Sequence, residues 1–294
     1  MTNSLPDAAR ATLPAPYREA AFVHRRRGLF DDPEIDVFVD ADGAFAVLHP
    51  RPVLDYAHYV PRQQKLGLGA YKKTLDVIDR RSAKVADLFP ASGTVLEVGA
   101  AEGNFLANLR VSRPGLALAA VEPDRDTADA RHALSLEGNF ADVAAAATAG
   151  IKADIVCFFH VFEHIGEPRA FLDSLRVVLA PGGRILIEVP SLDDPLLSLY
   201  ALPAYEAFYF QRQHPFVYSG RSLSRVLEAN GWAVREIRPY QRYGLENHLN
   251  WLRQGKPGGD AGLAAVLAGT ESAYRSALEA SGKTDTVFAV AEPR

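Results

Sequence analysis

Three groups of residues near the middle of the chain have types and spacings that are suited to chemistry. The first is a turn, Glu97-x-Gly99-x-Ala101-x-Gly103, which directly follows a short apolar run. The second is a single carboxylate, Glu122, 19 residues after Gly103. The third is the run His160-Val161-Phe162-Glu163-His164, which follows another apolar stretch. Together they suggest a cofactor site with titratable groups nearby.

The turn and the later glutamate fit a nucleoside. Gly99 and Gly103 would let backbone N–H groups approach a ligand closely. Glu122 ends a predicted strand, where a carboxylate can accept hydrogen bonds from both hydroxyls of a ribose. Either feature alone is typical of an ordinary strand–helix turn with an exposed glutamate. Both together, in this order, favour a nucleoside cofactor.

The spacing of the turn bears on which nucleoside it is. Dinucleotide-binding turns follow the pattern G-x-G-x-x-G and place a pyrophosphate at a helix N-terminus. This chain instead has Gly99-x-x-x-Gly103, preceded by Glu97. A carboxylate at that point would repel a pyrophosphate, whereas it suits a ligand with an ammonium and a sulfonium group. The turn therefore argues against NAD and for S-adenosylmethionine.

The histidine run has three interpretations, which stay open. If it begins a helix, His160, Glu163 and His164 share one face, and His214, in a later aromatic segment, can return over the same site. In the first interpretation, a histidine of this group, with an ordinary pKa near ~6.5, is the general base for a hydroxyl acceptor. In the second, His160, Glu163, His164 and His214 hold a divalent metal. In the third, they only brace the loop and the cofactor.

The same run spells H-x-x-E-H, the inverted zinc-peptidase motif. That reading needs a long helix and a third ligand on a following helix. Here the motif follows a buried strand, and Gly166-Glu167-Pro168 interrupts it. The peptidase interpretation is therefore disfavoured.

The elements that must position these groups alternate between strand and helix from Thr94 onward. Such alternation predicts a parallel sheet covered by helices on both faces. Strands are expected over 95–98, 116–122, 138–142, 154–159, 184–189, 232–238 and 286–291. Helices are expected over 71–89, 104–110, 124–136, 167–179, 222–230 and, as one segment, near 262–280. Residues 1–70 form an N-terminal extension with a β-hairpin over 35–48, and residues 71–294 form the main domain with long connections at 191–219 and 239–285.

Several runs resemble class I methyltransferases. VLEVGAAEGNFLANL resembles the first motif of that family, with Ala101 in place of the middle glycine, and AAVEPD resembles the second. ADIVCFFHVFEHIGEPRAFLDSLRVVLAPGGRILIEVPS resembles the region from strand four to strand five of the subfamily with an E-H signature. The resemblance covers residues 71–240. It implies an α/β, Rossmann-like seven-stranded sheet, mostly parallel with an antiparallel last strand, and S-adenosyl-L-methionine as cofactor.

The resemblance and the turn together give the candidate site. The cofactor-binding candidates are Tyr71, Glu97, Gly99, Ala100, Ala101, Gly103, Asn104, Phe105, Glu122, Pro123, Phe140, Phe159 and His160. Similar E-x-x-E-H clusters bind a metal in some O-methyltransferases, and His160 stands here where those have glutamate. A divalent metal is therefore an alternative, not the favoured expectation.

Aromatic and amide side chains in the two long connections suggest the acceptor. The substrate-binding candidates are Tyr205, Tyr218, Tyr243, Asn247 and His248. Such a mixture suits a sugar, a nucleotide sugar or another polyhydroxylated small molecule. A lid or a homodimer contact explains the same composition equally well. Nitrogen or carbon acceptors, and a non-catalytic partner that only binds the cofactor, remain alternatives.

The composition limits partners and location. The 294 residues include 32 basic and 36 acidic side chains, for a net charge of −4, so no general attraction to nucleic acid or anionic lipid is expected. The single cysteine, Cys157, excludes an internal disulfide and fits a reducing compartment. The first residues lack a secretory pattern, and no apolar run is long enough for a bilayer. These features predict a cytoplasmic protein.

Overall fold

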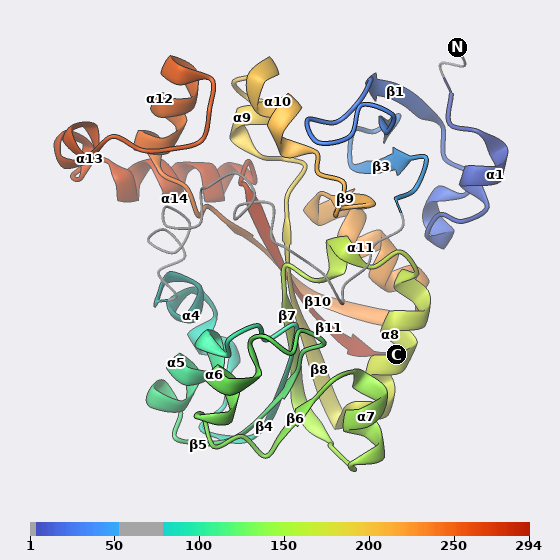
Figure 1. Cartoon of the computed structure of the whole chain (residues 1–294), viewed down its shortest axis with the longest axis vertical. Helices are drawn as coiled ribbons and strands as arrows, with labels where there is room; N and C mark the ends of the chain where they lie inside the picture. Colours follow the sequence, from blue (N-terminus) through green and yellow to red (C-terminus); the bar gives the residue numbers. More distant parts are fainter. Residues whose placement is uncertain (1–3, 53–78) are drawn as a thin grey trace. The chain divides into compact units, whose positions relative to one another are not determined.

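The computed structural model describes residues 4–52 and 79–294 (Figure 1). The chain divides into two compact units. The first unit comprises residues 1–53, 162–168 and 188–289, and the second comprises residues 54–161, 169–187 and 290–294.

The second unit is built on parallel strands with buried apolar residues. Its strands are β4 (Ser92–Val98), β5 (Gly115–Val121), β6 (Gly138–Phe140) and β7 (Ala153–Phe159), and β4 pairs in parallel with both β5 and β7. Near-continuous runs of Val, Leu, Ile, Ala and Phe explain this, because a strand covered on both faces has no polar side. The helices are α4 (Asp79–Val85), α5 (Asn104–Ser112), α6 (Ala128–His132), α7 (Val143–Thr148) and α8 (Pro168–Val178). They lie on both sides of the strands (Figure 1).

The strands of the main sheet follow the order β10-β11-β8-β7-β4-β5-β6. The remaining three are β8 (Leu179–Pro190), β10 (Trp232–Tyr240) and β11 (Thr286–Pro293). The sheet is mostly parallel, with one antiparallel pair at its end. The prediction of a Rossmann-like, seven-stranded sheet is confirmed.

A second sheet in the first unit is absent from the sequence prediction. Its order is β1 (Phe22–Arg26), β2 (Asp36–Asp40), β3 (Phe45–His49) and β9 (Phe216–Tyr218), and all its pairs are antiparallel. β2 and β3 form a hairpin within the predicted 35–48 segment. Buried Asp40 closes its turn by accepting from the N–H groups of Ala44 and Phe45, both at 2.7 Å.

The other elements of the first unit are short helices. They are α1 (Asp7–Arg10), α9 (Pro195–Ser198), α10 (Pro203–Tyr209), α11 (Gly220–Ala229), α12 (Leu245–Gln254), α13 (Ala261–Leu267) and α14 (Glu271–Ser281). The single helix expected near 262–280 is wrong, because Gly269 separates α13 from α14. The helix expected over 124–136 is shorter than predicted, covering only α6. Of the helix expected over 71–89, residues 71–78 lie outside the described residues. Among the described helices, none has the length and apolar character needed to cross a bilayer.

Candidate functional site

The glycine turn joins β4 to α5 in the second unit. Gly99, Ala101 and Gly103 all have left-handed backbone conformations, with φ of 77°, 46° and 79°. A Cβ atom on Gly99 would lie 2.4 Å from Cγ2 of Val161, so both conformation and space require glycine there. Ala101 adopts the same region despite its methyl group, which is unfavourable for an L-residue. This strained turn follows Glu97 directly.

Glu122, at the end of β5, is tied to the same turn. Its Oε2 accepts from the N–H of Ala101 at 2.8 Å, and its Oε1 accepts from the N–H of Asp124 at 2.9 Å. The side chain is half-buried. Because β4 and β5 are neighbours in the sheet, Glu97 near the end of β4 and Glu122 after β5 both lie at the glycine turn.

Glu97 is a buried carboxyl of this unit with a strongly shifted pKa. Its side chain is 4% exposed, and its Oε2 has no hydrogen-bond partner among those residues. Burial raises the pKa of Glu97 to about 8; Arg81 opposes this shift and Glu122 adds to it. A buried carboxyl without a full set of partners either stays protonated or binds a cation.

Arg131 is a buried residue that the sequence reasoning missed. Its guanidinium donates to the carbonyl oxygen of Ala101, to Oδ1 of Asn139 at 3.0 Å and to the carbonyl oxygen of Asp124 at 3.2 Å. It therefore fixes the carbonyl side of the turn against the segments after β5 and in β6. An arginine in a short polar helix carries no sequence signal of this role.

The remaining cofactor candidates occupy varied positions. Phe105 and Phe159 are buried against each other, with ring centroids 4.6 Å apart. Ala100 is buried, Phe140 is half-buried, and Asn104 and Pro123 are exposed. His160 directly follows β7, the strand that pairs with β4, and has a left-handed φ of 56°. Tyr71 lies outside the described residues.

A second group of titratable side chains lies in the first unit. Glu163, His164 and His214 each bring a ligand-type atom within 4.8 Å of the others, and we call them the Glu-His-His cluster. The two imidazole rings are 4.8 Å apart and nearly perpendicular. Nδ1 of His164 is 2.8 Å from the carbonyl oxygen of Gln213. Because a carbonyl only accepts, Nδ1 carries a hydrogen, and in the neutral ring the lone pair is therefore on Nε2.

The histidine run does not begin a helix at His160, so the condition for a shared helix face is not met. Residues Phe162–His164 form one 3₁₀ turn, and α8 begins only at Pro168. The left-handed φ of His160 cannot start a right-handed helix. Glu163 and His164 still come together with His214, by a turn and not by a helix face. His160 belongs to the second unit and is not part of this cluster.

Tyr218 adds a buried phenol beside the cluster. Its side chain is fully buried and stacks on Phe162 with ring centroids 5.4 Å apart. Its hydroxyl has no hydrogen-bond partner among the described residues. Burial, with the charge of Glu163 next, raises the pKa of Tyr218 well above its ordinary value. The phenol therefore stays protonated.

Three other substrate candidates face inward. The hydroxyl of Tyr205 donates to Oδ2 of Asp194 at 2.6 Å, and Nδ2 of Asn247 donates to the carbonyl oxygen of Gly258 at 3.2 Å. Nδ1 of His248 is 2.7 Å from the hydroxyl of Tyr274. Burial, with the charge of Arg275 second, lowers the pKa of His248 to about 4, so this histidine is neutral near pH 7.

These bonds give Tyr205, Asn247 and His248 structural partners within the two long connections. Tyr243 is half-buried, and its N–H donates to Asp285 at 2.9 Å. Contact of any of these residues with a substrate stays a prediction.

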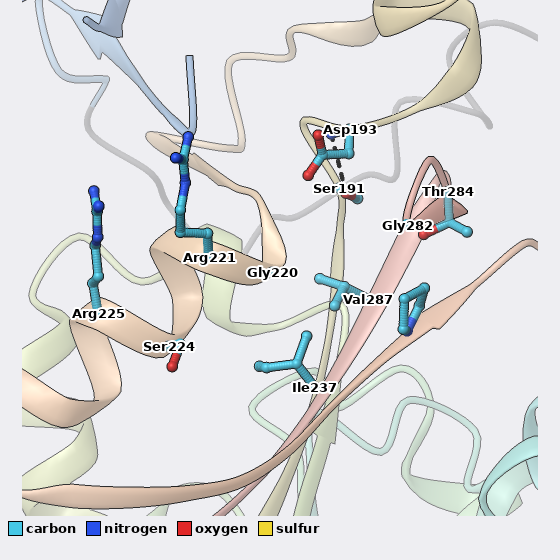
Figure 2. A pocket seen from close by; sticks show the side chains of 11 residues that line it. Ser191, Asp193, Gly220, Arg221, Ser224, Arg225, Ile237, Gly282, Thr284 and Val287 are labelled. Atoms are coloured by element: carbon cyan, nitrogen blue, oxygen red, sulfur yellow. Dashed lines mark hydrogen bonds between the residues drawn. The ribbon is translucent and has the colours of Figure 1, made fainter. Parts of the chain in front are cut away.

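A cavity of about 470 Å³ lies elsewhere in the first unit (Figure 2). It opens between the start of α11 and strands β10 and β11. Its lining residues are Ser191, Asp193, Gly220, Arg221, Ser224, Arg225, Ile237, Pro239, Gly282, Thr284 and Val287. Figure 2 shows Arg221 and Arg225 extending from α11, and both donate to Asp42. The lining contains none of the cofactor, catalytic or substrate candidates predicted from the sequence.

Comparison with known proteins gives one family and many structural relatives. Residues 29–237 match the family model described as a methyltransferase domain. A S-adenosylmethionine-dependent methyltransferase from Archaeoglobus fulgidus is similar with a TM-score of 0.50 and 16% identity, over 74% of this chain and 93% of the other. The plantazolicin methyltransferase BpumL is similar with a TM-score of 0.51 and 14% identity, over 80% and 91%. No curated protein matches the sequence.

Proposed function

Because the chain belongs to the methyltransferase-domain family, we propose that it transfers a methyl group from S-adenosylmethionine to a hydroxyl of a small molecule such as a sugar or nucleotide sugar. S-adenosylmethionine is the ligand named for the Archaeoglobus fulgidus relative. When bound, it supplies a methyl group made electrophilic by the positive sulfonium.

The observation that carries this proposal is the state of Glu97. A buried carboxyl with an oxygen that lacks a partner among the described residues is suited to a ligand that brings a cation. The ammonium of S-adenosylmethionine is such a group. Glu122 suits the ribose, because its carboxylate can accept hydroxyls in addition to the two N–H groups it already holds. The residues present therefore fit the cofactor.

Calorimetry with S-adenosylmethionine and S-adenosylhomocysteine tests the assignment. We expect binding by the wild-type chain, and a loss of at least tenfold in Glu97→Ala, since one charge-assisted hydrogen bond contributes roughly 1.5–3 kcal/mol. Glu102→Ala is the matched control, because this acid of the same turn is exposed and, among the described residues, bonds Asn104 alone. No binding by the wild type at millimolar ligand would sink the proposal.

Histidine base catalysis belongs to the same proposal. In the neutral ring of His164 the lone pair is on Nε2, because Nδ1 faces a carbonyl, so Nε2 can take the proton that the acceptor hydroxyl loses. His214 and His160 are the alternative bases. Turnover of His164→Ala, His214→Ala and His160→Ala should be compared with the true acceptor. If all three keep the wild-type rate, no histidine is the base.

The Glu-His-His cluster favours a second candidate, a metal-assisted O-methyltransferase. Two imidazoles and a carboxylate are a common ligand set for a divalent transition metal. The Nδ1–H of His164 on a carbonyl resembles the outer hydrogen bond that orients a metal-bound histidine. Elemental analysis of the purified protein and turnover after exhaustive chelation test this. A metal-free protein with unchanged turnover removes this candidate.

The acceptor and the cellular setting complete the proposal. A neutral-to-acidic chain with one buried thiol, Cys157, is consistent with a cytoplasmic enzyme acting on a small molecule, alone or as a homodimer. Methylation at nitrogen or carbon, and a partner protein that binds the cofactor without turning it over, are the competing outcomes. Product analysis by mass spectrometry with candidate acceptors separates them.

A further inference from the structure

We infer that Arg51 positions the Glu-His-His cluster, although it belongs to the N-terminal extension and touches no reacting group. The inference rests on the proposed role of that cluster. Two separate chain segments supply the cluster: the loop 162–168 carries Glu163 and His164, and the segment before β9 carries His214. Some contact must fix these segments relative to each other.

Arg51 holds the first segment by its backbone. Its Nη1 donates to the carbonyl oxygen of Gly166 at 3.0 Å and to Oε1 of Glu167 at 3.2 Å. Gly166 is two residues from His164, and a glycine there would otherwise leave the loop with wide conformational freedom. The hydrogen bond to a carbonyl oxygen therefore restricts the part of the loop that immediately follows Glu163 and His164.

The same guanidinium lies over the second segment. Its central carbon is 5.1 Å from the ring centroid of Phe216, which is two residues after His214. Phe216 is in turn paired with Val47 of β3, and the N–H of Leu48 donates to the carbonyl oxygen of Pro215 at 3.1 Å. The side chain of Arg51, two residues after the end of β3, thus contacts both segments of the cluster.

Arg51 is itself held in place. Its Nη2 donates to the carbonyl oxygen of Thr12 at 2.6 Å, and only a quarter of its side chain is exposed. The planar guanidinium can donate in two directions and stack on a ring at once. A lysine ammonium is a point charge on a flexible stem and cannot meet all three demands. The geometry therefore requires arginine and not merely a positive charge.

The charge of Arg51 also acts beside the cluster. Burial and then the charge of Glu163 raise the pKa of Tyr218, and the charge of Arg51 opposes this rise. The charges of Glu163 and of Arg51 therefore both act on the phenol of Tyr218. Removing Arg51 leaves this buried region with one cation fewer as well as a looser loop.

The experiment compares Arg51→Ala and Arg51→Lys with the wild type by nitrogen-15 NMR of the histidine rings and by steady-state kinetics. We expect the His164 signals of the Nδ1–H tautomer to give way to averaged signals in both variants. We also expect kcat to fall by about tenfold or more, because small misplacements of reacting groups have effects of that size. The KM for S-adenosylmethionine should stay within about twofold.

Arg25→Ala is the matched control. It removes an arginine of β1 whose Nε lies 2.9 Å from Oε1 of Glu206, and it touches neither segment of the cluster. It should leave the His164 signals and kcat unchanged. An unchanged His164 spectrum in folded Arg51→Lys would overturn the inference, as would full activity in that variant. Because the spectrum needs no turnover, a protein without methyl transfer would still show whether Arg51 positions the cluster.

Discussion

Glu97→Gln should make the protein more stable than the wild type, and increasingly so as the pH rises. Burial raises the pKa of Glu97 from the ordinary 4.5 to about 8, so the folded chain binds this proton more tightly than the unfolded chain. Between these two pKa values, Glu97 is largely ionised in the unfolded chain and still protonated in the folded chain. The free energy of unfolding of the wild type therefore falls as the pH rises, and most of the loss is complete above pH 8.

The size of the effect follows from the two pKa values. At about 1.36 kcal/mol per pKa unit, this carboxyl removes of order 3 kcal/mol from the free energy of unfolding at pH 7, and approaches about 5 kcal/mol above pH 8. Glutamine keeps the shape of the side chain but cannot ionise. The advantage of Glu97→Gln should hence be small near pH 5 and reach a plateau near pH 9.

Urea denaturation followed by circular dichroism, at half-unit steps from pH 5 to 9, measures this advantage. Asp194→Asn is the control from the first unit. Burial, with the charge of Asp285 second, raises the pKa of Asp194 to about 8 as well, but far along the chain from the glycine turn. Its own pH-dependent gain should add to that of Glu97→Gln in the double variant. A difference between Glu97→Gln and wild type that does not vary with pH would refute the reasoning.

Three further predictions concern the glycine turn. Ala101→Gly should raise the free energy of unfolding by about 1 kcal/mol, because it relieves the left-handed strain of an L-residue; a lower thermal midpoint would contradict this. Gly99→Ala should abolish S-adenosylmethionine binding and lower the thermal midpoint, because its Cβ would meet Val161, whereas Gly150→Ala, with a similar φ and open space, should keep binding. Binding of S-adenosylmethionine at pH 7 should release close to one proton more in the wild type than in Glu97→Gln, as seen by calorimetry in buffers of different ionisation enthalpy.

The sequence predicts the parts of the fold whose signals are local. The apolar runs of β4, β5 and β7 predict strands, because a strand buried on both faces requires apolar side chains. The glycines after β4 predict a turn, because glycine adopts a left-handed backbone most easily. The 3₁₀ turn at Phe162–His164 was not predictable, since the left-handed φ of His160 has no sequence signature. Arg131 and Arg51 were missed for a similar reason, because their partners are backbone carbonyls in distant segments.

Long-range pairing explains the other omission. The three residues of β9 lie in an aromatic connection without strand periodicity, and they become a strand only because β3 provides a partner. The inward orientation of Tyr205 and His248 depends likewise on Asp194 and Tyr274. A composition that suits a sugar site is the same composition that fills a buried, hydrogen-bonded connection.

The β3–β9 pairing also dictates an order of events during synthesis. Phe45 pairs with Tyr218, about 170 residues later, so the four-stranded sheet cannot be completed until most of the chain has emerged from the ribosome. Until then β3 is an edge strand, open to other strands in the cell. The strand that covers this edge is β9, and His214 lies two residues before it. Closing the vulnerable edge and assembling the Glu-His-His cluster are thus one late step of folding.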